Sequence, residues 1–174
     1  MAFEVTKVYM EHFPALRFIG KRYTNDDRDE KAGFGTKWEE WGNSDRFDVL
    51  KKAVHVAPFD ATPIGLMTDA SQFTYWIGLF FPAGTAVPDG YDYLDLPESD
   101  IGTGWVCGKD SEIYGAPPMK AVCMALWDAG YGKHRYDILG PGSNTICFFE
   151  RYVSGRFDVA DENGNVTLDY GNYF

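Results

Sequence analysis

The chain has 174 residues, of which 45% are hydrophobic and 24% charged, and its formal net charge at pH 7 is −10. This composition is typical of a globular protein and argues against an intrinsically disordered chain. The acidic balance argues against direct nucleic-acid binding, because phosphate contacts require clustered Lys and Arg. No apolar run reaches membrane-spanning length, so we expect no membrane partner. The aromatic share of 17% is high, and we expect part of it to line a pocket.

The cysteines and histidines are few and scattered. The three cysteines are Cys107, Cys123 and Cys147. Their number is odd and their spacing wide, which indicates free buried thiols rather than a disulfide framework or a zinc site. The three histidines show no paired spacing for a metal ion either. We therefore expect no metal, no cofactor and, with no secretory signal at the N-terminus, a cytoplasmic location.

The first half of the chain alternates between strand and helix patterns. Two strands, two helical segments and two more strands are predicted at residues 3–9, 14–23, 34–41, 44–54, 64–68 and 73–81. Phe34, Trp38 and Trp41 recur at helical spacing, and we expect them to pack in the core. The strand 73–81 is apolar on both faces, which predicts a central position in the sheet. A loop rich in Pro, Gly and Asp follows over residues 82–100.

The second half repeats this order. A strand closes at Gly108, 88 residues after Gly20 closes its counterpart. Pro117 is placed to begin the next helix and Gly130 to end it. Its predicted buried stripe consists of Met119, Val122, Cys123, Leu126 and Trp127. Strands are then predicted at 144–154, 156–160 and 166–170, with a turn at Asn163–Gly164 between the last two.

The element order predicts an α+β fold built from two copies of strand, helix, strand, strand. The copies would be halves of one domain, 1–174, divided into about 1–88 and 89–174. Such halves pair into one curved antiparallel sheet with two helices on one face. The other face would then be free to form a ligand groove.

The predicted strand 144–154 carries a carboxylate in an apolar setting. Alternate residues of a strand share a face, which here holds Ile146, Phe148, Glu150 and Tyr152. A charge among apolar groups is costly unless something compensates it, so Glu150 is the leading candidate for function. The alternatives are an exposed carboxylate on an edge strand or an ion pair with Lys133 or Arg135.

Seven short segments stand out in order along the chain: Arg17–Gly20, Trp38 with Trp41, Tyr75–Leu79, Leu96–Pro97, Gly104–Gly108, Leu126–Tyr131 and Phe149–Tyr152. Together they resemble the GyrI-like family, also described as the AraC-type or bacterial transcription activator effector-binding domain. Each is weak alone, but their order and spacing cover nearly the whole chain.

The resemblance implies the duplicated fold with a ligand bound between the halves. It also implies that the Glu of the Glu-x-Tyr motif, here Glu150, contacts the ligand or acts as a catalytic acid. Family members include sensors of lipophilic cations, a gyrase-inhibitory protein, and hydrolases that open cyclopropane rings in genotoxic natural products. The regulators carry a DNA-binding domain ahead of this module, whereas this chain begins with the first strand. We therefore expect a stand-alone member, whose regulatory role would need a separate regulator protein.

Six residues are candidates for contact with a small-molecule ligand. They are Glu150, Tyr152, Phe148, Trp105, Trp76 and Tyr75. Packing in the core is an equal alternative for Tyr75 and Trp76, and sheet packing with a solvated hydroxyl is one for Tyr152.

Three functions are open at this point. The first is binding of a lipophilic, cationic or aromatic molecule, with Glu150 as counter-charge and rings giving cation–π support. The second is a hydrolase in which Glu150, helped by Tyr152, directs water onto a cyclopropane ring. The third is a protein-interaction module like the gyrase inhibitor. The sequence leaves open whether the chain is an enzyme.

Overall fold

The computed structural model describes residues 2–69, 72–131 and 146–173. The strands and helices are, in chain order, β1 (Phe3–Phe13), β2 (Leu16–Tyr23), α1 (Gly35–Gly42), α2 (Arg46–Val54), β3 (Asp60–Asp69), β4 (Phe73–Pro82), β5 (Asp92–Leu96), β6 (Ser99–Gly108), α3 (Ala116–Asp128), β7 (Ile146–Arg151) and β8 (Val166–Tyr173). Short 3-10 turns lie at Asn25–Asp27 and Asp110–Glu112. No helix in the described part of the chain is long and apolar enough to cross a membrane.

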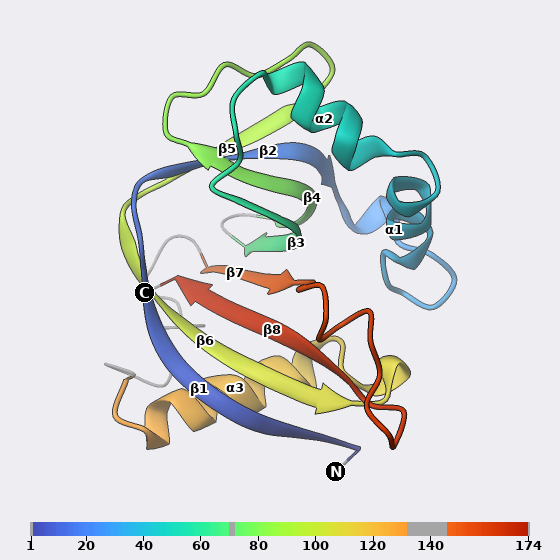
Figure 1. Cartoon of the computed structure of the whole chain (residues 1–174), viewed down its shortest axis with the longest axis vertical. Helices are drawn as coiled ribbons and strands as arrows, with labels where there is room; N and C mark the ends of the chain where they lie inside the picture. The colour runs from blue at the N-terminus through green and yellow to red at the C-terminus, as the bar shows by residue number, and fades with distance from the viewer. Residues whose placement is uncertain (1, 70–71, 132–145, 174) are drawn as a thin grey trace.

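All eight strands form one antiparallel sheet in the order β1-β6-β8-β7-β3-β4-β2-β5. The order is symmetric about its centre, where β7 pairs with β3. Moving outward, β8 matches β4, β6 matches β2, and β1 matches β5. Helices α1 and α2 lie beside the upper strands of Figure 1 and α3 beside the lower ones. The α+β class and the curved antiparallel sheet are thus confirmed.

Two predicted elements differ from the structure. The loop predicted over 82–100 contains β5, which pairs with β2 and turns Leu94 toward the core. The strand predicted over 156–160 is a series of turns instead. There the backbone N–H groups of Arg156 and Phe157 both donate to the carbonyl of Val153, which diverts them from a ladder. The turn predicted at Asn163–Gly164 is confirmed, with Gly164 at a φ of 73°.

One face of the sheet carries all three helices, and we call it the helix face. Register partners in an antiparallel ladder share a face, so the row Tyr170, Glu150, Gly65 and Ile77 defines it. At one end of this row Val122 of α3 packs with Tyr170. At the other end Ile77 belongs to the same core cluster as Trp41 of α1 and Leu50 of α2. Glu150 therefore lies on the helix face and not on the opposite face. It lies between two helix groups, of which one is α1 with α2 and the other is α3.

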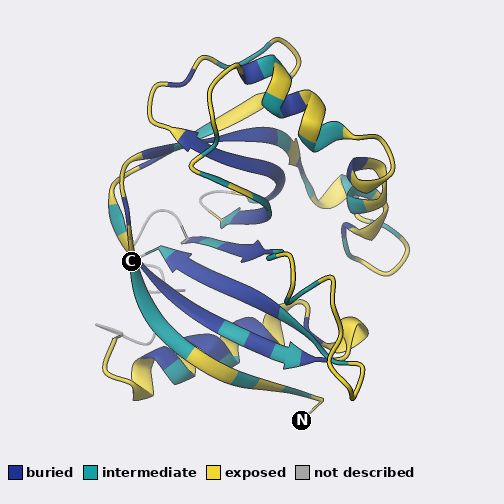
Figure 2. Cartoon of the chain, viewed as in Figure 1, coloured by how far each residue is buried: buried dark blue, intermediate teal, exposed yellow. Residues whose placement is uncertain are grey.

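The opposite face closes on an apolar core of its own. The ring of Phe13, on edge strand β1, stacks on Phe149 of β7 at 5.9 Å between centroids. It also meets Phe80 of β4 edge-on at 5.8 Å. Four strands separate β1 from β4 in the sheet, so this contact requires the sheet to curl around these rings. Figure 2 shows the resulting burial along the central strands.

The predicted stripe of α3 is correct except at its last member. Met119, Val122, Cys123 and Leu126 are buried, whereas Trp127 is 39% exposed. Each residue advances the helix by about 100°, so position i+8 points about 80° away from position i. Trp127 therefore turns toward the rim of the buried face rather than into it.

Candidate functional site

Glu150 lies in the centre of the sheet and is hidden from solvent. Its strand, β7, has β8 on one side and β3 on the other, and its register partners are Tyr170 and Gly65. Only 6% of the residue is exposed. The alternative of an exposed carboxylate on an edge strand is therefore wrong.

Three tyrosine hydroxyls surround the Glu150 carboxylate. Tyr152 donates a hydrogen bond of 2.9 Å and Tyr75 one of 3.1 Å, both to Oε2. The Tyr170 hydroxyl lies 3.3 Å from Oε1 and also 2.9 Å from the carbonyl oxygen of Ile113. A hydroxyl has one proton, so Tyr170 donates to only one of these acceptors at a time. When it donates to Ile113, its oxygen can accept a proton held on Oε1, and the site then suits a neutral carboxyl as well as an ionised one.

Aromatic rings cover this arrangement. Trp38 of α1 donates from Nε1 to the hydroxyl of Tyr75 at 2.8 Å, and its ring lies 4.4 Å from that of Tyr152. Gly65 makes room for both groups on the sheet surface. A Cβ on Gly65 would lie 2.4 Å from the Tyr75 hydroxyl oxygen and 3.1 Å from Cζ2 of Trp38. We call the rings of Trp38 and Tyr152 the aromatic lid over Glu150. The position of Trp38 in this lid depends on the absence of a side chain at Gly65.

Burial is the dominant electrostatic influence on the site. It raises the pKa of Glu150, while hydrogen bonds from Tyr152, Tyr75 and Tyr170 partly oppose the rise. Burial and the nearby carboxylate raise the pKa values of Tyr75 and Tyr152 well above the ordinary tyrosine value, so both stay protonated as donors. Among the described residues, no Lys, Arg or His nitrogen forms an ion pair with Glu150. The alternative partners Lys133 and Arg135 lie outside the described residues.

The structure brings together four of the six predicted ligand-contact residues. Tyr75 and Tyr152 bond to Glu150, and Phe148 shares its face and packs against the cores of both halves. Trp76 and Trp105 lie on the opposite face.

Strand alternation explains this separation. Trp76 joins the apolar core opposite the helices, with Phe18 edge-on at 6.2 Å. Trp105 pairs with Asp169 and lies between Lys7 and Arg156, whose charged groups are 4.5 and 4.2 Å from its ring centroid. Neither tryptophan can reach the Glu150 carboxylate without crossing the sheet.

Sequence reasoning missed two members of the site, Tyr170 and Trp38. Tyr170 falls in a correctly predicted strand, but its pairing with Glu150 depends on a register that the long connection 152–165 hides. The helical spacing of Trp38 predicts core packing, and nothing in the sequence indicates that its indole N–H has a partner on another element.

The described residues include no group of three or more His, Cys, Asp or Glu side chains that could hold a metal ion. The three cysteines are free, and Cys123 and Cys147 are buried. Burial raises the pKa of Cys123 to about 11 and that of Cys147 to about 12. These two thiols are therefore poor nucleophiles.

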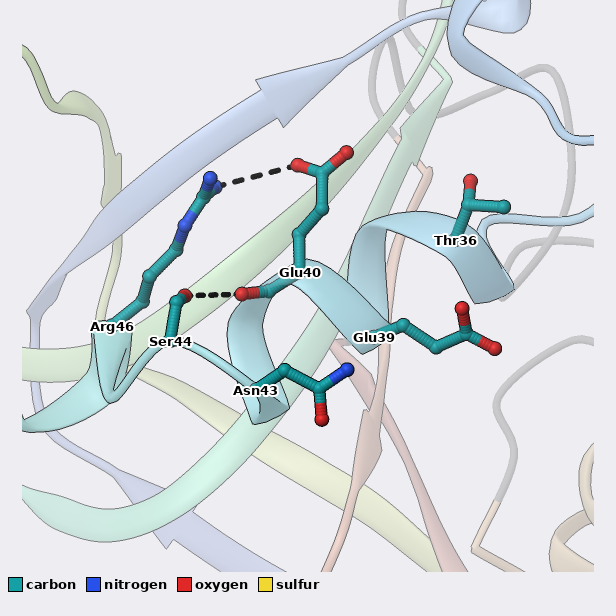
Figure 3. Close-up of a pocket in the computed structure, with 6 residues that line it drawn as sticks. All are labelled: Thr36, Glu39, Glu40, Asn43, Ser44 and Arg46. Carbon is teal, nitrogen blue, oxygen red and sulfur yellow. Dashed lines mark hydrogen bonds and ion pairs between the residues drawn. The ribbon is translucent and has the colours of Figure 1, made fainter.

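A hollow of about 480 Å³ lies on the surface at α1 and the start of α2 (Figure 3). It is lined by Thr36, Glu39, Glu40, Asn43, Ser44 and Arg46. Glu40 and Arg46 form an ion pair at 3.5 Å across it, and Ser44 bonds to the backbone of Glu40. The lining residues are all polar or charged types, and none of them belongs to the group around Glu150. This hollow is a solvated surface feature, separate from the buried carboxylate.

Neither the protein-family models nor the curated proteins give a match to this chain. Solved structures do. One is a protein described as a bacterial transcription regulation protein of Staphylococcus aureus MU50, at 19% identity and a TM-score of 0.56, covering 96% of this chain and 97% of that one. SAV2435 bound to tetraphenylphosphonium follows at 15% identity, TM-score 0.56, with 97% and 93% covered. EcmrR in complex with DNA matches at 10% identity, TM-score 0.56, with 99% of this chain and 57% of that chain covered. The chain thus shares its fold with these proteins, which is consistent with the GyrI-like fold that the sequence resemblance implies.

Proposed function

We propose that this protein binds a lipophilic aromatic cation whose charge is matched by Glu150. The observation that carries the proposal is a carboxylate at the sheet centre that is 6% exposed and has only tyrosine hydroxyls as partners among the described residues. The shared fold adds support, because SAV2435 has it and is bound to tetraphenylphosphonium, a cation of this class.

The physics of burial favours a cation over other ligands. Two unit charges 4 Å apart attract by about 4 kcal/mol at an effective dielectric constant of 20, against about 1 kcal/mol in bulk water. Removing water from Glu150 therefore strengthens its attraction for a cation that has little hydration to lose. A delocalised aromatic cation meets that condition, and the rings of Trp38, Tyr152 and Phe148 can add cation–π contacts.

Ligand entry requires the aromatic lid to move. The rings of Trp38 and Tyr152 lie over the carboxylate, and Phe148 fills the space between the two helix groups. Trp38 belongs to the eight-residue helix α1, and Tyr152 follows the end of β7. Both rings therefore sit at positions where rotation does not break the sheet, and the ligand's own rings replace the contacts that they lose.

The test uses three ligands of similar shape and different charge. Tetraphenylphosphonium, tetraphenylborate and neutral triphenylphosphine oxide are titrated into the protein by calorimetry and by quenching of tryptophan fluorescence. The cation is expected to bind, the anion not, and the neutral compound more weakly by at least about tenfold, or about 1.4 kcal/mol. Equal binding of all three would show that charge is irrelevant and would overturn the proposal.

Two variants locate the charge. Glu150→Gln is expected to weaken cation binding at least about tenfold while leaving triphenylphosphine oxide unchanged. Glu39→Gln is the matched control, because it removes one negative charge from an exposed position on α1. An unchanged cation affinity in Glu150→Gln would mean that the ligand lies elsewhere.

The raised pKa of Glu150 favours hydrolysis as a second candidate function. A buried carboxylate of raised pKa can take a proton from a water molecule while the water oxygen bonds to a cyclopropane carbon. The ring C–C bond then breaks, its electron pair passes to the rest of the alkylator, and Glu150 returns the proton there. The hydroxyl of Tyr152, which donates to the Glu150 carboxylate at 2.9 Å, can orient that carboxylate. In this case a cyclopropane-bearing alkylator should disappear in the presence of the protein, with the ring-opened water adduct appearing by mass spectrometry. Equal turnover by Glu150→Gln would exclude this function.

A further inference from the structure

The segment from Tyr152 to Phe157, which we call the strap, connects the two faces of the sheet. It begins with the tyrosine that donates to Glu150 and ends with Phe157, whose ring meets that of Tyr152 edge-on at 4.7 Å. Two backbone bonds to the carbonyl of Val153 fold it back on itself, with Gly155 at a φ of 84°. The strap thus presents Tyr152 and Phe157 together on the helix face.

Arg156, between these two rings, points the other way. Its Nη2 donates to both carboxylate oxygens of Asp169, at 2.6 and 2.8 Å, on the face opposite Glu150. Its guanidinium also stacks on Trp105 at 4.2 Å, and its carbonyl accepts a bond from Thr167 N at 2.9 Å. One side chain therefore anchors the strap to β6 and β8.

Asp169, to which Arg156 binds, is itself held in place by further charged residues. Asp169 is fully buried and also accepts from Arg151 at 3.1 Å. Arg151 in turn donates to Glu11 of β1 at 2.9 Å. Asp169 is thus held by strands β7 and β8, and its position does not depend on the strap. Of the two partners in this ion pair, Arg156 has more freedom to move, because its side chain is 31% exposed while that of Asp169 is not exposed at all.

We infer that the Arg156–Asp169 ion pair positions Tyr152 over Glu150, so that a contact on one face of the sheet sets the hydrogen bonding of the carboxyl on the other. Among the described residues, three hydroxyls face Glu150: Tyr152 from the strap, Tyr75 from β4 and Tyr170 from β8. Tyr75 and Tyr170 lie within strands, and the backbone N–H of Tyr152 donates to the carbonyl of Pro63 in β3 at 3.1 Å. The ring of Tyr152 differs from the other two because it packs edge-on against Phe157 of the strap, which Arg156 anchors to Asp169. The inference rests on the proposed function only in making Glu150 the ligand's counter-charge.

The test measures the Glu150 carboxyl itself and needs no ligand. Carboxyl-labelled protein is titrated by carbon NMR in four forms: unaltered, Tyr152→Phe, Arg156→Gln, and the double variant. The Tyr152 hydrogen bond lowers the pKa of Glu150, so Tyr152→Phe should raise it. Arg156→Gln should raise it as well, by releasing Tyr152. In the Tyr152→Phe background the effect of Arg156→Gln should disappear, because there is no longer a hydroxyl to misplace.

Loss of a positive charge alone would also raise the pKa, but that effect would persist in the Tyr152→Phe background. An Arg156→Gln effect that is the same in both backgrounds, or absent from both, would therefore overturn the inference. Arg156→Lys keeps the charge and one contact to Asp169, and it should give a smaller rise that vanishes in the same way. It also serves if Arg156→Gln does not fold. Since no ligand is present, failure of this cycle is separate from failure of cation binding.

Discussion

At the scale of single residues, the surroundings of Glu150 can accommodate both the ionised and the neutral form of its carboxyl group. Two tyrosines donate to Oε2, which favours the ionised form. Burial favours the neutral form, and Tyr170 can accept a proton from Oε1 when its own goes to Ile113. A cation arriving beside the carboxyl adds a strong preference for the ionised form. Under the proposed function, protonation and cation binding therefore compete at this carboxyl.

The raised pKa of Glu150 predicts that its ionised carboxylate lowers the free energy of unfolding at neutral pH. A carboxyl whose pKa is higher in the folded than in the unfolded state favours folding when protonated, and this contribution is lost as pH rises through the folded pKa. Glu150→Gln, which cannot ionise, should therefore raise the free energy of unfolding at pH 7.5 by about 0.5–2 kcal/mol, a typical gain for one stabilising substitution. Urea unfolding at pH 7.5 and pH 4 measures it. The gain should shrink at pH 4, and a variant less stable at pH 7.5 would contradict the prediction.

The same competition predicts a pH-dependent affinity. Binding of tetraphenylphosphonium requires the ionised carboxylate, so affinity should fall as pH drops through the raised pKa of Glu150, by at most about tenfold per pH unit. The proton that leaves Glu150 should appear as a difference in binding heat between buffers of different ionisation enthalpy. Affinity and heat that are independent of pH and buffer would show that the carboxyl is ionised before the ligand arrives.

At the scale of elements, a glycine on the strand beneath α3 and one on the strand beneath α1 have different roles. Gly104 of β6 lets α3 come close, since a Cβ there would lie 2.5 Å from Cγ1 of Val122. Gly65 of β3 instead holds open the space taken by the Tyr75 hydroxyl and the Trp38 ring. One glycine serves helix packing and the other serves the lid over Glu150.

Gly65→Ala should therefore disturb the site more than the fold. The added methyl group must displace Tyr75 or Trp38, and overpacking of this kind costs about 1–3 kcal/mol. We expect a weaker hydrogen bond from Trp38 to Tyr75, altered tryptophan fluorescence and lower affinity for the cation. Gly42→Ala in α1 is the control, because a Cβ there meets nothing within 4 Å. If both variants behave alike, Gly65 has no special role.

The sequence predicts which segments are strands and which are helices, but it predicts only in part which face of the sheet each strand residue lies on. On β7, alternation correctly grouped Phe148 with Glu150 and carried on to Tyr152. On β4 it failed to exclude Trp76, because both faces of that strand are buried and apolar, so the sequence does not show which one meets the helices. Tyr170 was hidden for a different reason. Its neighbour across the ladder is set by strand register, which composition does not encode.

At the scale of the whole molecule, the site lies where the symmetric halves of the sheet meet. Glu150 of β7 and Gly65 of β3 are paired across the central junction. Order and spacing of elements sufficed to predict the curved sheet, because each half repeats the same sequence of patterns. They did not suffice to place Glu150 on the helix face, since that depends on the strand register that pairs Glu150 with Tyr170 and Gly65.

This central position predicts that ligand binding stabilises the chain as one unit. Tyr75 of β4 and Tyr170 of β8 both contact Glu150, and Phe148 packs against the cores of both halves. A ligand at 100 times its dissociation constant should add about 2.7 kcal/mol to the free energy of unfolding. Calorimetry with tetraphenylphosphonium should show one transition moving to higher temperature, as the prediction of a single domain also requires. Glu150→Gln should show little shift. Two transitions, of which only one moves, would instead place the ligand within one half and separate the folding of the two.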